Sequence, residues 1–156
     1  MTSEEEESSN ILKADSALSW AEARFKQLSA VAESNLQIQQ VSPASLAYLG
    51  DAVYELYIRT RHLLPAKRIS DYHHQVVSQV RAESQANHLR SLEPHLTAPE
   101  LDILRRGRNA VTGSPRRLDP KIYQQATSLE TLIGYLFLTN PQRLTQLLAY
   151  LDLDPD

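Results

Sequence analysis

No cysteine occurs in the sequence, which excludes disulfides, thiolate metal sites and a cysteine nucleophile. Long hydrophobic runs are also missing. No segment approaches the ~20 apolar residues that span a bilayer, and no secretory signal follows the acidic start MTSEEEESSN. Glycine occurs only 4 times, and no long stretch alternates apolar and polar residues as a half-buried strand does. We therefore expect an all-α protein without a membrane span, located in the reducing cytoplasm.

The 156 residues are enough for one domain with a proper core. Residues 1–40 hold seven acidic and three basic residues, and we expect them to form an acidic tail, a helix over about 12–32 and a polar linker. Residues 41–156 are expected to form the main domain. The overall net charge of -3 conceals a basic segment, residues 105–121, with six basic residues and one acidic residue.

Helical spacing and breaker residues predict the helices of the main domain. Ser42-Pro43 and Asp119-Pro120 each combine an N-cap residue with proline at the first helical position. The first of these helices has an apolar stripe made of Leu46, Leu49, Val53 and Leu56. We expect further helices over 69–91, 99–106 (with Leu101 and Leu104 inside, ending at Gly107) and 141–151, and a loop over 108–118.

Two apolar helices each contain a glycine and an acidic residue. LAYLGDAVYEL carries Gly50 and Asp51, and ATSLETLIGYLFL carries Glu130 and Gly134. Glycine inside a helix costs about 1 kcal/mol relative to alanine, so it usually serves a close approach. A buried carboxylate is costly unless a cation or hydrogen-bond donors compensate it. One arrangement explains both the glycines and the acids in these helices: the helices cross at the glycines, and the two acids converge on a shared cation.

Oxygen ligands and the absence of cysteine favour Mg²⁺ at such a site, with Mn²⁺ as a substitute. Two simpler explanations stay open at this level. Asp51 could pair with Arg59 or Arg61 or lie at a solvated edge, and Glu130 stands three residues after Thr127, which is the spacing of a capping box. The five histidines lack the spacing of a zinc pair, and we assign none of them a catalytic role.

The two acidic segments carry a resemblance to a known family. LAYLGDAVYEL resembles the signature helix of the ribonuclease III catalytic domain, and SLETLIGYLFL resembles its second active-site helix. Their order and separation agree with that family, as does the basic segment between them. RRGRNAVTG and YQQATSLE are similar to the Mini-ribonuclease III branch, which lacks the double-stranded-RNA-binding domain. The resemblance covers about residues 40–150.

The resemblance implies that Asp51 and Glu130 are catalytic carboxylates that bind Mg²⁺. Ribonuclease III carries two further metal-site acids, but this sequence has Ala47 and Thr127 one turn before the retained pair, as the Mini-III branch does. The number of metal ions therefore stays open. Glu55, one turn after Asp51, could supplement the site, although a solvated or salt-bridged role is the expectation.

The resemblance also implies hydrolysis of double-stranded RNA to 5′-phosphate products, a homodimer, and precursor large-subunit (23S) ribosomal RNA as substrate. A wide apolar surface on the first signature helix (Tyr48, Tyr54, Tyr57 and Ile58) fits a subunit interface. A-form RNA is gripped through its backbone and shape, a task that suits basic residues on a loop. The candidate RNA contacts are Arg81, Arg105, Arg106, Arg108, Asn109, Arg116, Arg117 and Lys121.

Two other functions remain compatible with these residues. The loss of two family acids allows a non-catalytic RNA- or ribosome-binding module with a nuclease-like helical fold. The acidic tail and the helix over 12–32 also allow a helical scaffold that recruits a partner protein.

Overall fold

The computed structural model describes residues 23, 38–113, 115–151 and 153. In this part of the chain every regular element is helical, which confirms the all-α prediction. The expectations for residues 1–37 lie outside the described residues, apart from residue 23. No helix within the described part has the length and apolar character needed to cross a membrane. The elements are α3 (Pro43–His62), α4 (Ile69–Val80), α5 (Ala82–Leu92), the short 3-10 helix η2 (Glu93–His95), α6 (Ala98–Asn109), α7 (Pro120–Thr139) and α8 (Pro141–Leu148).

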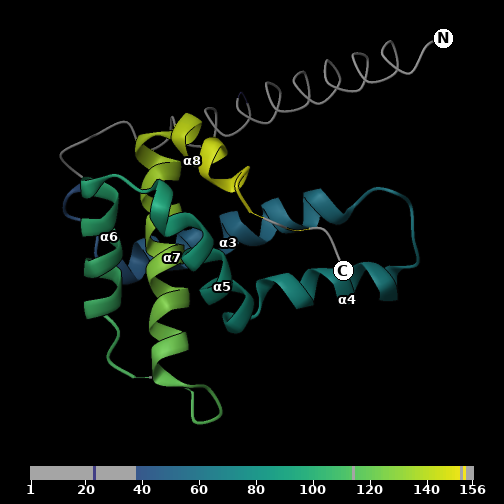
Figure 1. Cartoon of the computed structure of the whole chain (residues 1–156), viewed down its shortest axis with the longest axis horizontal. Coiled ribbons are helices and arrows are strands. Elements are labelled where there is room, and N and C mark those ends of the chain that lie inside the picture. The colour runs from purple at the N-terminus through teal and green to yellow at the C-terminus, as the bar shows by residue number, and fades with distance from the viewer. Residues whose placement is uncertain (1–22, 24–37, 114, 152, 154–156) are drawn as a thin grey trace.

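Helix α7 is the central element, and α3 crosses it while α5 and α6 lie on its two sides (Figure 1). In the second half of α7, residues on almost every face of the helix are buried, among them Leu129, Leu132 and Ile133. A helix that is apolar on most of its circumference needs neighbours on every side. This explains why α3, α5, α6 and α8 all pack against α7.

The predicted helix starts are confirmed. The Ser42 side chain accepts a hydrogen bond from the Ser45 backbone N–H at 3.1 Å, and the Asp119 side chain accepts one from Lys121 at 2.9 Å. Proline follows each of these caps. Local sequence therefore fixes where the two central helices begin.

The single helix expected over 69–91 is wrong, because the chain breaks at Arg81 into α4 and α5. Arg81 adopts an extended conformation with ψ 155°. Neither glycine nor proline marks this break in the sequence. The change of direction allows α4 to pack on α3 while α5 packs on α7, so tertiary packing decides it.

Other local expectations are corrected as well. α6 runs on to Asn109 and does not end at Gly107, so the following loop starts later than predicted. Leu101 and Leu56, both expected inside, are exposed at 45% and 50%. The last helix ends at Leu148 and not at 151. Gly107 is instead a packing residue: an added Cβ would lie 2.5 Å from the Thr131 hydroxyl of α7.

The expected close crossing of the two glycine-bearing helices is present. A Cβ at Gly50 would lie 1.7 Å from the backbone oxygen of Glu130, and one at Gly134 would lie 2.0 Å from that of Leu46. Backbone therefore packs directly on backbone where α3 crosses α7, and no side chain larger than hydrogen fits between them. This contact fixes the position of Glu130 relative to Asp51, the residue that follows Gly50.

Candidate active site

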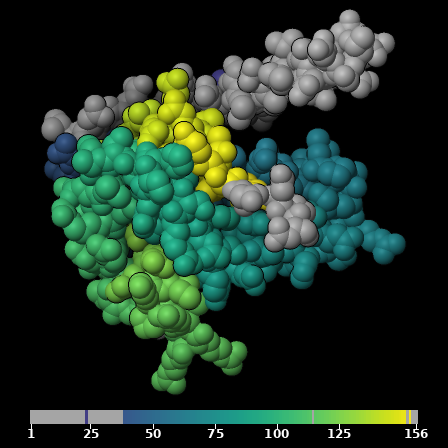
Figure 2. All heavy atoms as spheres, in the orientation of Figure 1, coloured from purple at the N-terminus to yellow at the C-terminus, as the bar shows by residue number. Residues whose placement is uncertain are grey.

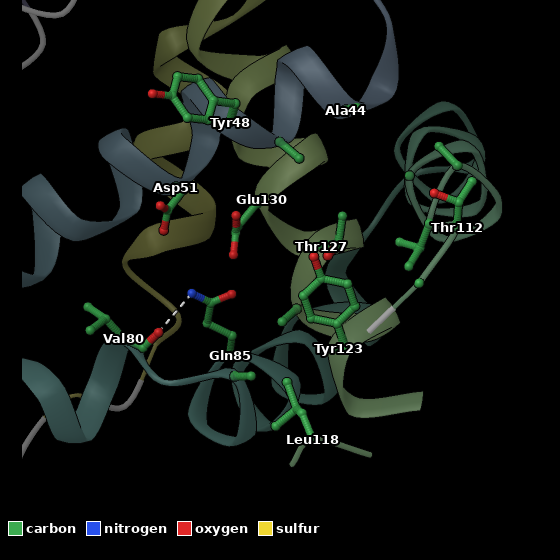
Figure 3. Close-up of a pocket in the computed structure, with 17 residues that line it drawn as sticks. Ala44, Tyr48, Asp51, Val80, Gln85, Thr112, Leu118, Tyr123, Thr127 and Glu130 are labelled. Atoms are coloured by element: carbon green, nitrogen blue, oxygen red, sulfur yellow. Dashed lines mark hydrogen bonds between the residues drawn. The ribbon is translucent and has the colours of Figure 1, made fainter. Parts of the chain in front are cut away.

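Asp51 on α3 and Glu130 on α7 lie beside the glycine crossing, and their side chains enter the same open space (Figure 3). Asp51 is on the exposed side of its helix, whereas Glu130 is half-buried. The two residues are 79 positions apart in the numbering, so only the helix crossing brings them together.

Both carboxyl groups hold their protons more tightly than usual. Burial raises the pKa of Glu130 to about 8, and the negative charge of Asp51 contributes to the rise, although the side-chain amide of Gln85 acts in the opposite direction as a hydrogen-bond donor. Partial burial also raises the pKa of Asp51, with a smaller contribution from Glu55. Two ionised carboxylates at this place therefore repel each other, and a cation between them would relieve that repulsion.

A groove of about 500 Å³ contains both acids. Its walls come from α3, α5, α6, α7 and the segment that follows α6. Ala47 and Thr127, which replace two family acids, line the same groove, so small side chains leave open the space around the pair. No lysine or arginine is among the described residues that line it. The described lining is thus acidic, and a bound cation would favour the entry of a polyanion.

The ion-pair explanation of Asp51 and the capping-box explanation of Glu130 are wrong for this structure, whereas the exposure of Asp51 agrees with a place at a solvated edge. Arg59 pairs with Glu55 at 2.8 Å, and none of the ion pairs among the described residues includes Asp51. This pairing confirms the salt-bridged role expected for Glu55. Thr127 lies in the middle of α7, where the chain makes no new helix start, so it cannot form a capping box with Glu130.

The residue types fit Mg²⁺ better than zinc. The donors that the groove brings together are two carboxylates, and no cluster of three or more His, Asp or Glu side chains suited to a metal occurs within the described residues. Zinc sites normally need three or four protein ligands, while Mg²⁺ keeps several waters and binds through one or two carboxylates plus substrate phosphate. Asp51 and Glu130 therefore match the minimal donor set of an Mg²⁺ site.

The candidate RNA contacts lie around the groove and not inside it. Arg108, Asn109, Arg116, Arg117 and Lys121 are all exposed. Their chain neighbours at 110–113 and 118 line the groove. Figure 2 shows the segment between α6 and α7 projecting from the bottom of the molecule. The basic side chains of this segment are thus available to a long substrate that also reaches the acids.

The remaining basic candidates already have protein partners. Arg105 and Arg106 both pair with Asp102 on the same helix, which reduces their net charge. Arg81 is exposed at the break between α4 and α5, and its Nε donates to the Ser84 hydroxyl at 3.3 Å. These pairings distinguish them from Arg116 and Arg117.

Sequence reasoning missed several residues of the groove. Tyr48, Thr112 and Tyr123 line it, as does Gln85, which lies directly beneath Glu130 (Figure 3). Gln85 is only 3% exposed although glutamine is usually a surface residue. Nothing in the pattern of α5 identifies it, because its burial results from the way α5 packs on α7.

Comparisons with known proteins agree with this geometry. Residues 44–141 match the Ribonuclease III domain. A Mini-ribonuclease 3 from Synechocystis sp. is 56% identical over 119 residues, which are 76% of this chain and 82% of that protein. A Mini-ribonuclease 3 from Synechococcus sp. is 59% identical over 72% of this chain and 82% of its own length.

A solved structure shows a similar fold. The crystal structure of a protein from Fusobacterium nucleatum is 28% identical and superposes with a TM-score of 0.65, covering 69% of this chain and 90% of the other. The match to the Ribonuclease III domain extends over α3 to α7, which include the helices that line the groove. The chain belongs to the Mini-ribonuclease 3 family of ribonuclease III-type endoribonucleases, which act on RNA.

Proposed function

We propose that this protein is an Mg²⁺-dependent endoribonuclease that cleaves double-stranded RNA, with Asp51 and Glu130 as its catalytic, metal-binding carboxylates. The observation that carries the proposal is the pair of carboxylates that share a groove whose described lining has no basic side chain. Members of the ribonuclease III family generally use divalent metal ions, and the donor set here suits such an ion.

The two acids would hold Mg²⁺ directly or through water. When bound, the ion supplies charge neutralisation at the phosphate and a more acidic water. Asp51, on the exposed side of α3, presents its charge at the open part of the groove. Glu130, whose backbone is in close contact with Gly50, would supply the second carboxylate ligand. Water attacks phosphorus, the bond to the 3′ oxygen breaks, and the products carry a 5′-phosphate and a 3′-hydroxyl.

We assign the binding of the duplex to exposed basic side chains at 108–121. They are exposed and adjoin the segment that lines the groove, whereas the described lining itself offers no basic side chain to phosphates. The physiological substrate we propose is the precursor of large-subunit (23S) ribosomal RNA, processed in the cytoplasm. Residues 41–156 would form the catalytic domain, with 1–40 outside it.

Incubation of the purified chain with a long RNA duplex tests the proposal. We expect cleavage with Mg²⁺, restoration by Mn²⁺ after chelation, no cleavage with chelator alone, and 5′-phosphate ends on the products. A single-stranded RNA of the same length and a DNA duplex are the controls. Binding of the duplex without cleavage would instead support a non-catalytic RNA-binding module, and neither binding nor cleavage would support a helical scaffold.

Replacement of both Arg116 and Arg117 by alanine should weaken duplex binding and flatten its dependence on salt, without unfolding the domain. Each phosphate contact contributes about one unit to the slope of log K against log salt, so the slope should fall by about one to two. The matched control is the double alanine variant of Arg105 and Arg106. This control removes the same positive charge, but it also leaves Asp102 without its two arginine partners. We expect the slope of log K against log salt to fall more for the variant of Arg116 and Arg117.

An unchanged slope in the variant of Arg116 and Arg117, measured by filter binding or anisotropy over a range of salt, would exclude this loop as a phosphate clamp.

We also propose a homodimer, on grounds different from those in the sequence. Tyr54 and Ile58 are fully buried in the core of the chain, and the hydroxyl of Tyr57 donates to the Leu148 carbonyl, so these three residues are not available to a partner. Tyr48, the fourth residue expected at the interface, is 86% exposed, and the other exposed large hydrophobic side chains on α3 and α4 are Leu56, Ile69 and Val77. Sedimentation velocity should give twice the monomer mass, and a monomer at micromolar concentration would contradict the proposal.

A further inference from the structure

One face of α7 carries two hydroxyl groups beside Glu130. Tyr123, Thr127 and Glu130 follow one another at steps of four and three residues, so they form a row along the helix. All three line the groove that contains Asp51. Figure 3 shows Tyr123 with its hydroxyl end turned toward Thr127, on the side of α7 that also carries Glu130. The wall that α7 gives to the groove is therefore acidic at Glu130 and carries neutral hydroxyls next to it.

The other serine and threonine hydroxyls of α7 bond inside the protein. Ser128, Thr131 and Thr139 each donate to the carbonyl one turn earlier, at 2.6, 2.8 and 2.8 Å. A bond of this kind satisfies such a hydroxyl within its own helix. In the part of the chain that the structure describes, the hydroxyls of Tyr123 and Thr127 have no hydrogen-bond partner, and both side chains are partly exposed. The two groove hydroxyls are thus open to a ligand.

The chemistry of the groove indicates which part of a duplex these hydroxyls contact. Its described lining has no lysine or arginine, the side chains that neutralise phosphates. A protein hydroxyl both donates and accepts a hydrogen bond, as the ribose 2′-hydroxyl does, whereas an ionised phosphate oxygen only accepts. The neutral hydroxyls of the groove therefore match the sugar of an RNA strand better than its phosphates.

The place of the two residues on α7 indicates which sugars are within reach. At a rise of about 1.5 Å per residue, Thr127 and Tyr123 stand about 5 and about 10 Å from Glu130 along the helix axis. Successive nucleotides of a duplex strand rise about 3.4 Å, so these lengths correspond to about one to three nucleotides of a strand that follows the groove. The sugars nearest to a bond cut beside Glu130 are thus the ones that pass the two hydroxyls.

We propose that the hydroxyls of Tyr123 and Thr127 bind the ribose 2′-hydroxyl of a nucleotide within about three positions of the cut bond, and thereby favour RNA over DNA. This inference rests on the proposed function, in which the strand is cut at Asp51 and Glu130. RNA duplexes display their 2′-hydroxyls in a wide, shallow minor groove, and this group distinguishes RNA from DNA at a given contact. Tyr123 and Thr127 are therefore substrate-binding residues that determine specificity.

A synthetic RNA duplex with a mapped cut bond tests the inference, together with versions of it that carry a single 2′-deoxy nucleotide at each position around that bond. The wild type, Tyr123→Phe and Thr127→Val are compared by kcat/KM on each duplex, and the Tm of each protein is measured. Both substitutions remove a hydroxyl and keep the shape of the side chain. Tyr135→Phe is the matched control, because it makes the same change on α7 at a residue that is not among the described lining of the groove.

We expect one deoxy position to lower the kcat/KM of the wild type by about 3- to 10-fold, the effect of losing one hydrogen bond. Tyr123→Phe and Thr127→Val should each cause a loss in this range on the all-RNA duplex. On the duplex with that deoxy nucleotide they should cause little further loss, because the partner of the hydroxyl is already missing. Tyr135→Phe should cleave both duplexes as the wild type does, and all four proteins should melt at similar temperatures.

Equal losses of Tyr123→Phe and Thr127→Val on the two duplexes would overturn the inference, because their hydroxyls would then contact a group other than the 2′-hydroxyl. Wild-type cleavage of every deoxy duplex would overturn it as well, and so would an equal loss in Tyr135→Phe. If one variant does not fold, the other still provides the comparison. A wild type that leaves the all-RNA duplex intact would instead contradict the proposed function, and the role of the two hydroxyls with it.

Discussion

Gly50→Ala is expected to prevent stable folding of the domain. The added methyl group would lie 1.7 Å from the backbone oxygen of Glu130, 2.6 Å from its carbonyl carbon and 2.9 Å from the nitrogen of Gly134. All three are backbone atoms of α7, so no side-chain rotation relieves the overlap. The two central helices must move apart, and the core between them loses its packing. We expect a loss above about 4 kcal/mol, beyond the usual range for overpacking.

Thermal or urea unfolding followed by circular dichroism measures this loss, and two other glycines provide a graded control. Nothing lies within 4 Å of a Cβ added at Gly113, so Gly113→Ala should leave the Tm nearly unchanged. At Gly107 the nearest atom is the Thr131 hydroxyl at 2.5 Å, a side-chain group that can shift partly, so an intermediate loss is expected. A wild-type Tm for Gly50→Ala would show that α3 and α7 do not cross as described.

Asp51→Asn and Glu130→Gln are each expected to lower the rate of duplex cleavage by about 10³-fold or more, equivalent to about 4 kcal/mol of transition-state stabilisation. Each variant keeps the shape of the side chain and removes one of the two carboxylates among the described residues of the groove. Duplex binding at low salt should persist, because the basic side chains lie outside the groove. If either variant cleaves at the wild-type rate, the site assignment is wrong.

The stability of Glu130→Gln separates loss of chemistry from loss of fold. The pKa of Glu130 is about 8 in the folded protein, above its ordinary value of 4.5, so the folded state binds the proton more tightly than the unfolded state. Ionisation therefore destabilises the metal-free protein progressively between pH 4.5 and 8, and fully above that range. At about 1.4 kcal/mol per pKa unit, the ceiling is a few kcal/mol.

With chelator present, Glu130→Gln should thus melt several degrees above the wild type at pH 8 and above. The gain should disappear below pH 4.5, where both states of the wild type are protonated. Added Mg²⁺ should stabilise the wild type more than the variant. A variant that melts below the wild type at high pH would show that Glu130 is compensated by a group of the protein itself.

The sequence by itself determined the helical class, the starts of α3 and α7, and the pairing of an acid with a glycine on each of them. These features are local. A cap followed by proline acts within one turn, and an acid inside an apolar helix is conspicuous wherever the helix packs. The glycine crossing could be inferred because glycine in a helix interior is costly without a close neighbour, and the structure shows backbone atoms at that place.

Tertiary structure alone decided the break at Arg81, the role of Gly107 and the place of Gln85. Each depends on packing against α3 or α7, which are separate from these residues in the chain. No local sequence signal therefore predicts it. The same reason explains why the sequence assigned Tyr54 and Ile58 to a subunit interface, although both belong to the chain's own core. The apolar pattern of a helix shows how much of it is buried, but only the packed neighbours decide which face meets the core, the groove or a partner.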